Sequence, residues 1–365
     1  MANFDTSGLA LAAVCPSNKM ILDDKGMPGF YVQVAAQKLS DLITGGDDTV
    51  HPAFRVNGVE VPSLYIGKYQ GVEDAGRIYS LPGVDPKGSI THDQYVDRCR
   101  AKGVGHHCIT AAEWAFLALW CRKNGTMPKG NNNYGKDVSE TSYEAIPANY
   151  GLDGKINRTL TGTGPLSWRH NGQIDGIADL NGNVSEWITG IRLVYGEIQV
   201  IPWNNAADPD VDLSATSAQW KAIKASASSW EDLFITPNGQ GTTTGSVKLD
   251  YVSSHWQWDT TITSKEDSNR IALFYLTTAA SGIGATAKLY LQAMALLPED
   301  NQEGDTYGAD NFYSNNGVEE LLAIRGGLWN HGIGAGVFEV DFRCKRSDVS
   351  SYYGSRTAYV DLPTD

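Results

Sequence analysis

The sequence is poor in cysteine and in charged side chains, and each shortage excludes a class of protein. Its five cysteines are odd in number and widely spaced, and none forms a C-x-x-C pair. Such cysteines indicate neither a disulfide framework nor a zinc site, so we expect buried thiols in a reducing compartment. Charged residues make up 19% of the chain, the net charge is −13, and lysine and arginine do not cluster. The chain therefore lacks the basic stripe that nucleic acid or an anionic membrane surface requires.

Long apolar runs are missing as well. No stretch approaches the ~18 apolar residues of a membrane helix. The short apolar segment at residues 9–14 has no basic region before it, as a secretory signal would. We therefore expect a soluble protein, made in the cytoplasm and not inserted into a membrane. If it is viral, we expect it on the virion surface, at a tail or fibre tip.

The common catalytic and cofactor motifs do not occur. The sequence has no H-E-x-x-H, no histidine–carboxylate facial triad and no G-x-S-x-G elbow. Residues 281–287 look faintly like a dinucleotide loop but lack its βαβ frame, so we expect a plain turn. Residues 208–212 alternate aspartates but lack the glycine and the final glutamate of an EF-hand, so we expect a solvated loop. These gaps favour a protein that is not an enzyme.

What the chain has instead is glycine and large aromatic residues, with 39 Gly, 10 Trp and 17 Tyr. This composition is typical of a loop-rich domain held together by aromatic packing. Capping boxes that begin at Thr91 and Thr110 predict two helices, ending near Gly103 and Gly125. In the second helix, apolar residues from Trp114 onward recur at helical spacing and predict a buried face.

Weaker patterns suggest the remaining elements. A helical turn near 35–42, a hairpin at 54–61 around the turn dipeptide Asn57-Gly58, and a strand at 64–69 precede the two helices. Residues 127–185 are rich in Gly, Asn and Ser yet contain scattered Tyr and Trp, which indicates ordered loops. Beyond them we expect a helix at 217–225 and strands near 246–252, 271–277 and 288–296.

One turn is unusually rich in oxygen atoms. Residues 179–187 read D-L-N-G-N-V-S-E-W, with two carboxylates and several small polar residues before a tryptophan. A hard cation such as calcium prefers such an oxygen set. The alternative is an ion-free turn in which Asn and Asp side chains cap the backbone.

Three stretches, in order, resemble the formylglycine-generating-enzyme type of C-type lectin fold. They are I-T-A-A-E-W at 109–114, the turn at 179–187, and I-R-G-G-L-W at 324–329, followed by G-S-R at 354–356 where the family has G-F-R. The resemblance spans roughly residues 60–360. It implies an α+β, loop-rich C-type lectin fold with two helices on a small twisted antiparallel sheet.

Within that superfamily the chain most resembles the variable proteins of diversity-generating retroelements, which include phage tropism determinants. In those proteins the C-terminal R-G-G-x-W segment is rewritten at adenines, mainly in Asn codons. The resemblance implies a variable region at 324–359 that binds a protein or glycan on a host surface. Mutation of the adenines in an Asn codon can produce some amino acids and not others. The residues of this region that could arise in this way, and that we call codon-reachable, are Leu328, Asn330, His331, Ile333, Asp341, Arg343, Cys344, Arg346, Asp348, Ser350, Tyr352, Tyr353 and Ser355.

Residues of this region that are not codon-reachable, and apolar residues that we expect to stay constant, should form the scaffold. We expect Arg325, Trp329, Val337, Phe338, Val340 and Phe342 in the core, with Glu339 and Lys345 also fixed. Residues 328–355 should then zigzag between buried scaffold and exposed ligand-binding positions.

The resemblance also implies a structural calcium ion, but the sequence lacks other functional residues of the family. Calcium ligands map onto Asp179, Gly182, Val184 and Glu186. Ser185 stands where the family has a tryptophan, so the local packing must differ. The family's catalytic cysteine pair is absent, because only Cys344 lies in the C-terminal half, and no histidine–glutamate iron site replaces it.

For the whole chain we expect an N-terminal segment, 1–60, packed on or extending the main domain. The lectin-like domain would cover 61–365, with a long insertion near 195–320. Two other functions stay open: an invariant lectin-like virion protein, and an oxidase of the formylglycine-generating type. A near-repeat of the 324–359 coding DNA beside a reverse transcriptase gene would separate the variable protein from the invariant one.

Overall fold

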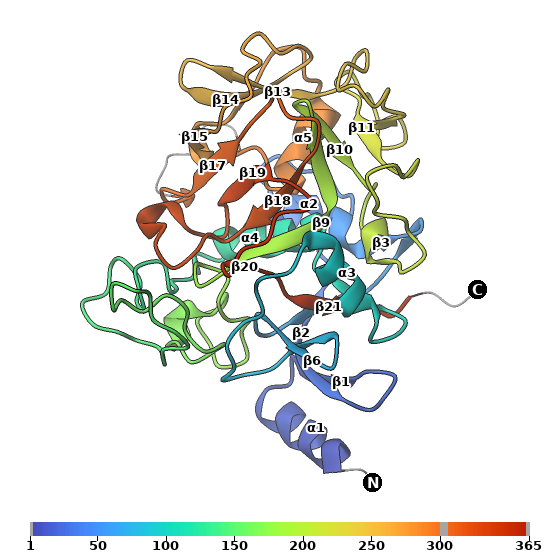
Figure 1. The fold of residues 1–365 in the computed structure, drawn as a ribbon. Coiled ribbons are helices and arrows are strands. Elements are labelled where there is room, and N and C mark those ends of the chain that lie inside the picture. The colour runs from blue at the N-terminus through green and yellow to red at the C-terminus, as the bar shows by residue number, and fades with distance from the viewer. Residues whose placement is uncertain (1–2, 300–305, 363–365) are drawn as a thin grey trace.

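The computed structural model describes residues 3–299 and 306–362, which form a mixed α+β structure that is mostly sheet (Figure 1). The helices are α1 (Asn3–Val14), α2 (Leu39–Leu42), α3 (His92–Arg100), α4 (Ala111–Lys123) and α5 (Ala285–Ala293). Short 3-10 turns lie at Pro52–Phe54, Leu166–Trp168, Asn205–Ala207, Phe274–Leu276 and Gly332–Gly334. Within the described ranges, no helix combines the length and the apolar character needed to cross a membrane.

A smaller sheet joins the two ends of the chain. Its order is β1 (Asn18–Leu22), β2 (Pro28–Ala35), β5 (Ser63–Gly67), β21 (Thr357–Tyr359) and β8 (His106–Cys108). Strand β21 pairs antiparallel with both β5 and β8. The last residues of the predicted variable region are therefore anchored in the same sheet as the N-terminal strands.

The larger sheet carries the C-terminal strands in its middle. Its order is β15 (Arg270–Leu273), β17 (Asn311–Ser314), β19 (Val340–Cys344), β18 (Leu321–Arg325), β9 (Ser185–Val194), β10 (Glu197–Val200), β13 (Lys248–Val252), β14 (His255–Asp259) and β16 (Thr278–Ala279). Strands β11 (Lys221–Ile223) and β12 (Phe234–Ile235) continue from β10, and β20 (Tyr353–Gly354) pairs with β9. Two separate hairpins are β3 (Arg55–Val56) with β4 (Val59–Glu60), and β6 (Gly71–Asp74) with β7 (Arg77–Ser80).

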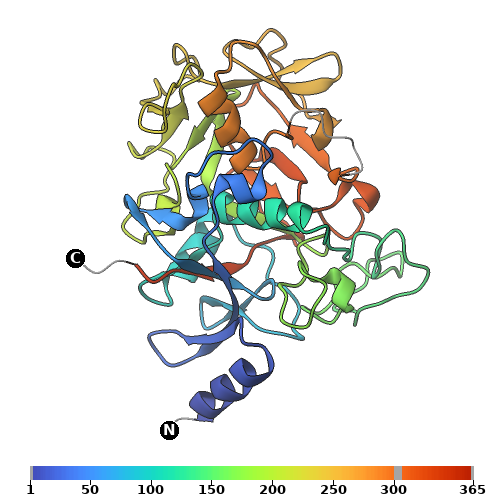
Figure 2. The same ribbon diagram turned by 180° about the vertical axis from the view of Figure 1, so that it is seen from behind.

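Helices α3 and α4 begin where the sequence predicts. Thr91 and Thr110 are the N-caps, and each closes a capping box with the residue three positions later. Helix α4 packs on β9, and α5 packs on α4, so both lie on the same side of the larger sheet (Figure 2). Trp114 of α4 is buried at 1% exposure, because the apolar face of this helix forms the centre of the core.

The long loops between α4 and β9 are held by buried asparagine side chains. Asn131 Nδ2 donates to the carbonyl oxygen of Asn157 at 2.8 Å, and Asn132 Nδ2 donates to Asn181 Oδ1 at 3.2 Å. Asn183 Oδ1 accepts from the backbone N–H of Thr159 at 2.8 Å. These bonds satisfy backbone and side-chain groups that a buried loop would otherwise leave unpaired.

The structure differs from the sequence prediction in three elements. The sheet is not small and antiparallel, because β17 pairs parallel with β19, β14 with β16, and β20 with β9. The helix expected at 217–225 does not form: the segment contains the short strand β11 at 221–223 with turns on either side, since pairing with β10 overrides its helical propensity. The strand expected at 288–296 is instead helix α5, whose buried Ala287, Tyr290 and Leu291 follow the helical period.

Candidate ligand-binding site

The three motif stretches meet at the end of β18. Trp114 Nε1 donates to the carbonyl oxygen of Val337 at 2.8 Å, and the backbone N–H of Gly182 donates to the carbonyl of Gly326 at 2.8 Å. A Cβ atom on Gly326, which has φ 86°, would lie 3.1 Å from both Trp114 and the carbonyl oxygen of Leu180. The first glycine of R-G-G therefore lets the helix, the turn and the strand approach one another.

The second glycine lets the chain pass over a buried carboxylate. Gly327 has φ 75°, and a Cβ atom there would lie 2.1 Å from Glu339 Oε2. Next to it, the buried Arg325 side chain donates to the carbonyl oxygens of Met294 and Ala295 at 3.1 and 3.0 Å. Burial lowers the pKa of Arg325 to about 9, although nearby carboxylates oppose that shift. This rigid corner fixes the start of the loop that follows β18.

A surface pocket of about 420 Å³ opens beside this corner, and more than half of the predicted variable positions line it. Its lining comes from β18 and the loop after it, from β19, from β20 and the residue before it, and from the loop before β15. The lining residues are Asn269, Ile324, Leu328, Trp329, Asn330, His331, Asp341, Arg343, Tyr352 and Tyr353.

Strand alternation places the charged pair of the pocket. Asp341 and Arg343 lie two residues apart on β19 and share a face, whereas Val340 and Phe342 point into the core. Arg343 donates from Nε and Nη2 to the two oxygens of Asp341 at 2.8 and 2.6 Å, and its guanidinium lies 3.9 Å from the Tyr313 ring centroid. Burial lowers the pKa of Arg343, but the Asp341 carboxylate outweighs it and raises the pKa overall.

A histidine–glutamate pair forms another side of the pocket. His331 Nδ1 lies 2.9 Å from Glu339 Oε1, and its ring lies 5.6 Å from that of Tyr313. Burial alone would lower the pKa of His331, but the hydrogen bond and the charge of Glu339 raise it above 6.5. Burial raises the pKa of Glu339 above 4.5, so each member of the pair affects the protonation of the other.

Aromatic rings line the rest of the pocket in an edge-to-face series. The ring centroids of Trp329 and Tyr352 are 5.8 Å apart, those of Tyr352 and Tyr353 are 4.9 Å apart, and those of Tyr353 and Trp187 are 5.3 Å apart. Val184, from the 179–187 turn, packs with Trp329 behind them. Such ring pairs add roughly 0.5–1.5 kcal/mol each beyond their buried area, so these side chains are held in place before any ligand arrives.

Four other predicted positions lie outside this pocket. Ile333 is 65% exposed, and Asp348 and Ser350 are half-buried in the loop after β19. Arg346 lines a second pocket of about 660 Å³.

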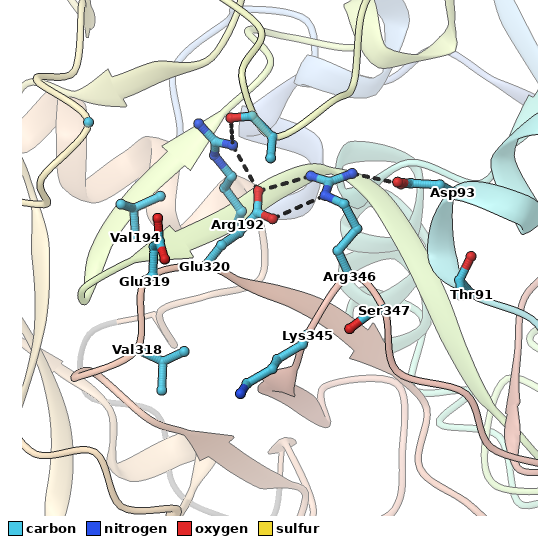
Figure 3. A pocket seen from close by; sticks show the side chains of 12 residues that line it. Thr91, Asp93, Arg192, Val194, Val318, Glu319, Glu320, Lys345, Arg346 and Ser347 are labelled. Carbon is cyan, nitrogen blue, oxygen red and sulfur yellow. Dashed lines mark hydrogen bonds and ion pairs between the residues drawn. The ribbon is translucent and has the colours of Figure 1, made fainter.

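In that second pocket Arg346 belongs to a network of ion pairs (Figure 3). It donates to both oxygens of Glu320 at 3.0 and 2.9 Å and to Asp93 at 2.7 Å. Glu320 also accepts from Arg192 at 2.8 Å. Arg346 thus ties the loop after β19 to the first turn of α3.

Two predicted positions are buried and line neither pocket. Cys344 is 1% exposed, and burial raises the pKa of its thiol well above the usual value. Ser355 is 0% exposed and donates from Oγ to the carbonyl oxygen of Trp187 at 2.6 Å. In this structure a ligand does not reach either side chain, since both help to hold the strands together.

The scaffold residues expected in the core are buried, whereas Lys345, also expected to be fixed scaffold, is exposed. The strand alternation that places the core residues could also have excluded Cys344 from the ligand-binding set. Arg325, Val337, Phe338, Val340 and Phe342 are each at most 1% exposed. Cys344 falls on their side of β19, in step with Val340 and Phe342.

The sequence does not predict that some of the residues at the pocket lie there. Trp329, expected in the core, is 7% exposed and lines the pocket with its neighbours. Asn269 lines the pocket, and the ring of Tyr313 packs beside it against Arg343 and His331. Both come from the 195–320 segment, which the pairing of β15 with β17 and of β17 with β19 brings to the site. No local pattern in the sequence signals these pairings.

The four residues assigned to calcium do come together, but around a nitrogen atom. The carbonyl oxygens of Asp179, Gly182 and Val184 and the Oε1 of Glu186 lie 3.3, 3.5, 3.0 and 3.1 Å from Gln70 Nε2. These oxygens accept from an amide and leave no open coordination position, so the residues as arranged do not fit a cation. Within the described ranges, no three His, Cys, Asp or Glu side chains are grouped so that they could hold a metal ion.

The chain was also compared with known proteins. No family model and no curated protein matches it. Among solved structures, it is similar to PvdO from Pseudomonas aeruginosa, with 13% identity over 93% of this chain and 97% of that chain and a TM-score of 0.35. It is also similar to the U1 variant of the Major Tropism Determinant, with 11% identity, 94% and 71% coverage and a TM-score of 0.31. Treponema denticola variable protein 1 gives 12% identity, 94% and 99% coverage and a TM-score of 0.33.

One of these is a variable protein and one a tropism determinant. These are the two kinds of protein that the sequence motifs resemble. Because the TM-scores are below 0.5, the functional proposal rests on the motifs and the pocket instead.

Proposed function

We propose that this chain is a non-enzymatic binding protein of C-type lectin fold, of the formylglycine-generating-enzyme type. Its recognition surface would be the pocket between β18, β19 and β20. One observation carries the proposal: seven codon-reachable residues line this pocket, while Val337, Phe338, Val340 and Phe342 of the same segment form the core. A segment built in this way can change its outward side chains and keep its packing.

The side chains of the pocket suit recognition by contact. Tyr352, Tyr353 and Trp329 offer large amphipathic rings that lose little conformational entropy, and Arg343 and His331 offer charged or polar donors. Because Asp341 and the neighbouring rings hold these groups, a ligand meets a surface that is already ordered. We propose that the ligand is a protein or glycan on a host surface and that the protein serves viral attachment.

Sequencing tests the variable character of the segment. The gene should be read at depth from a clonal population, together with its flanking DNA. The proposal predicts a near-repeat of the 324–359 coding DNA beside a reverse transcriptase gene, with substitutions concentrated at codons of the pocket residues. A uniform gene without such a repeat would favour the invariant lectin-like protein.

A further inference from the structure

Gln70 lies at the centre of the 179–187 turn although it is more than a hundred residues away in sequence. It follows β5, and its side chain is 0% exposed. Its amide nitrogen has two hydrogens, yet four oxygens lie within 3.0–3.5 Å of it. Its own oxygen accepts from Asn183 Nδ2 at 2.8 Å, which fixes the orientation of the amide.

A ring of carbonyl oxygens and one carboxylate around a single donor is the arrangement that a hard cation would use. A calcium ion would require these oxygens at about 2.3–2.6 Å, which the amide group prevents. The charge of Glu186 is already balanced, because Arg356 donates to its two carboxylate oxygens at 2.7 and 2.5 Å. Both side chains are at most 1% exposed, so neither is screened by water.

We propose that the amide of Gln70 takes the place of a structural cation in this turn. The native protein then holds the turn without metal, and removal of the amide converts the same oxygens into a divalent-cation site. Val184 of this turn packs against Leu328 and Trp329, so the wall of the pocket is also held without metal. The inference concerns the scaffold and does not depend on the proposed ligand.

Two substitutions test the proposal by thermal unfolding with chelator, with millimolar calcium, and with potassium at matched ionic strength. Gln70→Ala removes the donor and leaves space, and Gln70→Glu keeps the shape but adds a carboxylate beside Glu186. We expect calcium and chelator to leave the melting temperature of the native protein unchanged. Both variants should melt lower by roughly 2 °C or more. Calcium should raise their melting temperatures in a concentration-dependent manner, as mass action requires for an ion that binds the folded state.

Gln199→Ala is the matched control. Gln199 is also 0% exposed, and its amide donates to Glu197 Oε1 at 2.9 Å. Its loss should destabilise the protein without creating a calcium response.

The proposal is overturned if chelator lowers the melting temperature of the native protein, because a cation then holds the turn. It is also overturned if the Gln70 variants are destabilised but do not respond to calcium. Should the variants fail to fold, terbium luminescence excited through Trp187 in the native protein decides the matter. Bright, calcium-competed emission contradicts the proposal, and no emission supports it.

Discussion

Replacing Arg356 by methionine should be among the most damaging single changes in the chain. The guanidinium donates to both oxygens of Glu186 and to the carbonyl oxygens of Gly67, Ala178 and Asp179, at 2.5–3.2 Å. Methionine keeps much of the volume but leaves Glu186 as a buried carboxylate without its positively charged partner. Breaking a buried ion pair on one side costs about 3–5 kcal/mol, and we expect Arg356→Met to fall in that range.

Equilibrium denaturant unfolding of a double-mutant cycle measures this prediction. Glu186→Gln and Arg356→Met should each destabilise, and the double variant should lose less than the sum, with a coupling energy of roughly 0.5–3 kcal/mol. A cost below about 1 kcal/mol for Arg356→Met, typical of exposed pairs, would refute a buried network that holds the turn.

Two further predictions concern the segment itself. Phe338→Ala should cost about 3–5 kcal/mol, because that ring is 0% exposed and packs 4.9 Å from the ring of Tyr307. Ile333→Ala should change the unfolding free energy by only ~0.5 kcal/mol; similar costs for both would argue against the division into scaffold and surface. The raised pKa values of His331 and Glu339 predict stability that is present at low pH and is lost as the pH rises through them. The unfolding free energy of the native protein should therefore fall as the pH rises above 6.5. In the double variant His331→Gln with Glu339→Gln, the unfolding free energy should fall less steeply over the same range. Equal slopes for the two proteins would show that the His331–Glu339 pair does not cause the pH dependence.

The elements that could be predicted from sequence are those with strong local signals. The capping boxes at Thr91 and Thr110 open α3 and α4, and the Asn57-Gly58 dipeptide turns the β3–β4 hairpin, because each signal acts within a few residues. The segment that became α5 shows an apolar run that suits either a strand or a helix, and packing on α4 decides it. Local pattern alone could not supply that contact.

The candidate site was predictable only along its own segment. Strand alternation on β19 places Asp341 and Arg343 on the face that lines the pocket, in agreement with the codon argument, although Asp341 itself is only 3% exposed. Whether a codon can change does not determine whether its side chain is exposed. Ser355 is therefore codon-reachable and yet buried in the structure. The contacts of Gln70 with the 179–187 turn, and of Asn269 with the pocket, join segments far apart in sequence, so no motif reveals them.

We propose that recognition resides in the pocket beside β18 and β19, on a scaffold that does not change. The direct test replaces two sets of residues by other codon-reachable ones. The pocket set is Leu328, Asn330, His331, Asp341, Arg343, Tyr352 and Tyr353. The control set, which lies in the same segment but outside that pocket, is Ile333, Asp348 and Ser350.

Binding of the three proteins should be profiled on arrays of immobilised glycans and cell-surface proteins, with circular dichroism and melting recorded in parallel. Both variants should keep the parental spectrum and melt close to the parent. Only the pocket set should lose or change the binding profile of the parent. A parental profile that survives the pocket replacement, or that disappears with the control replacement, would place recognition elsewhere and contradict the claim.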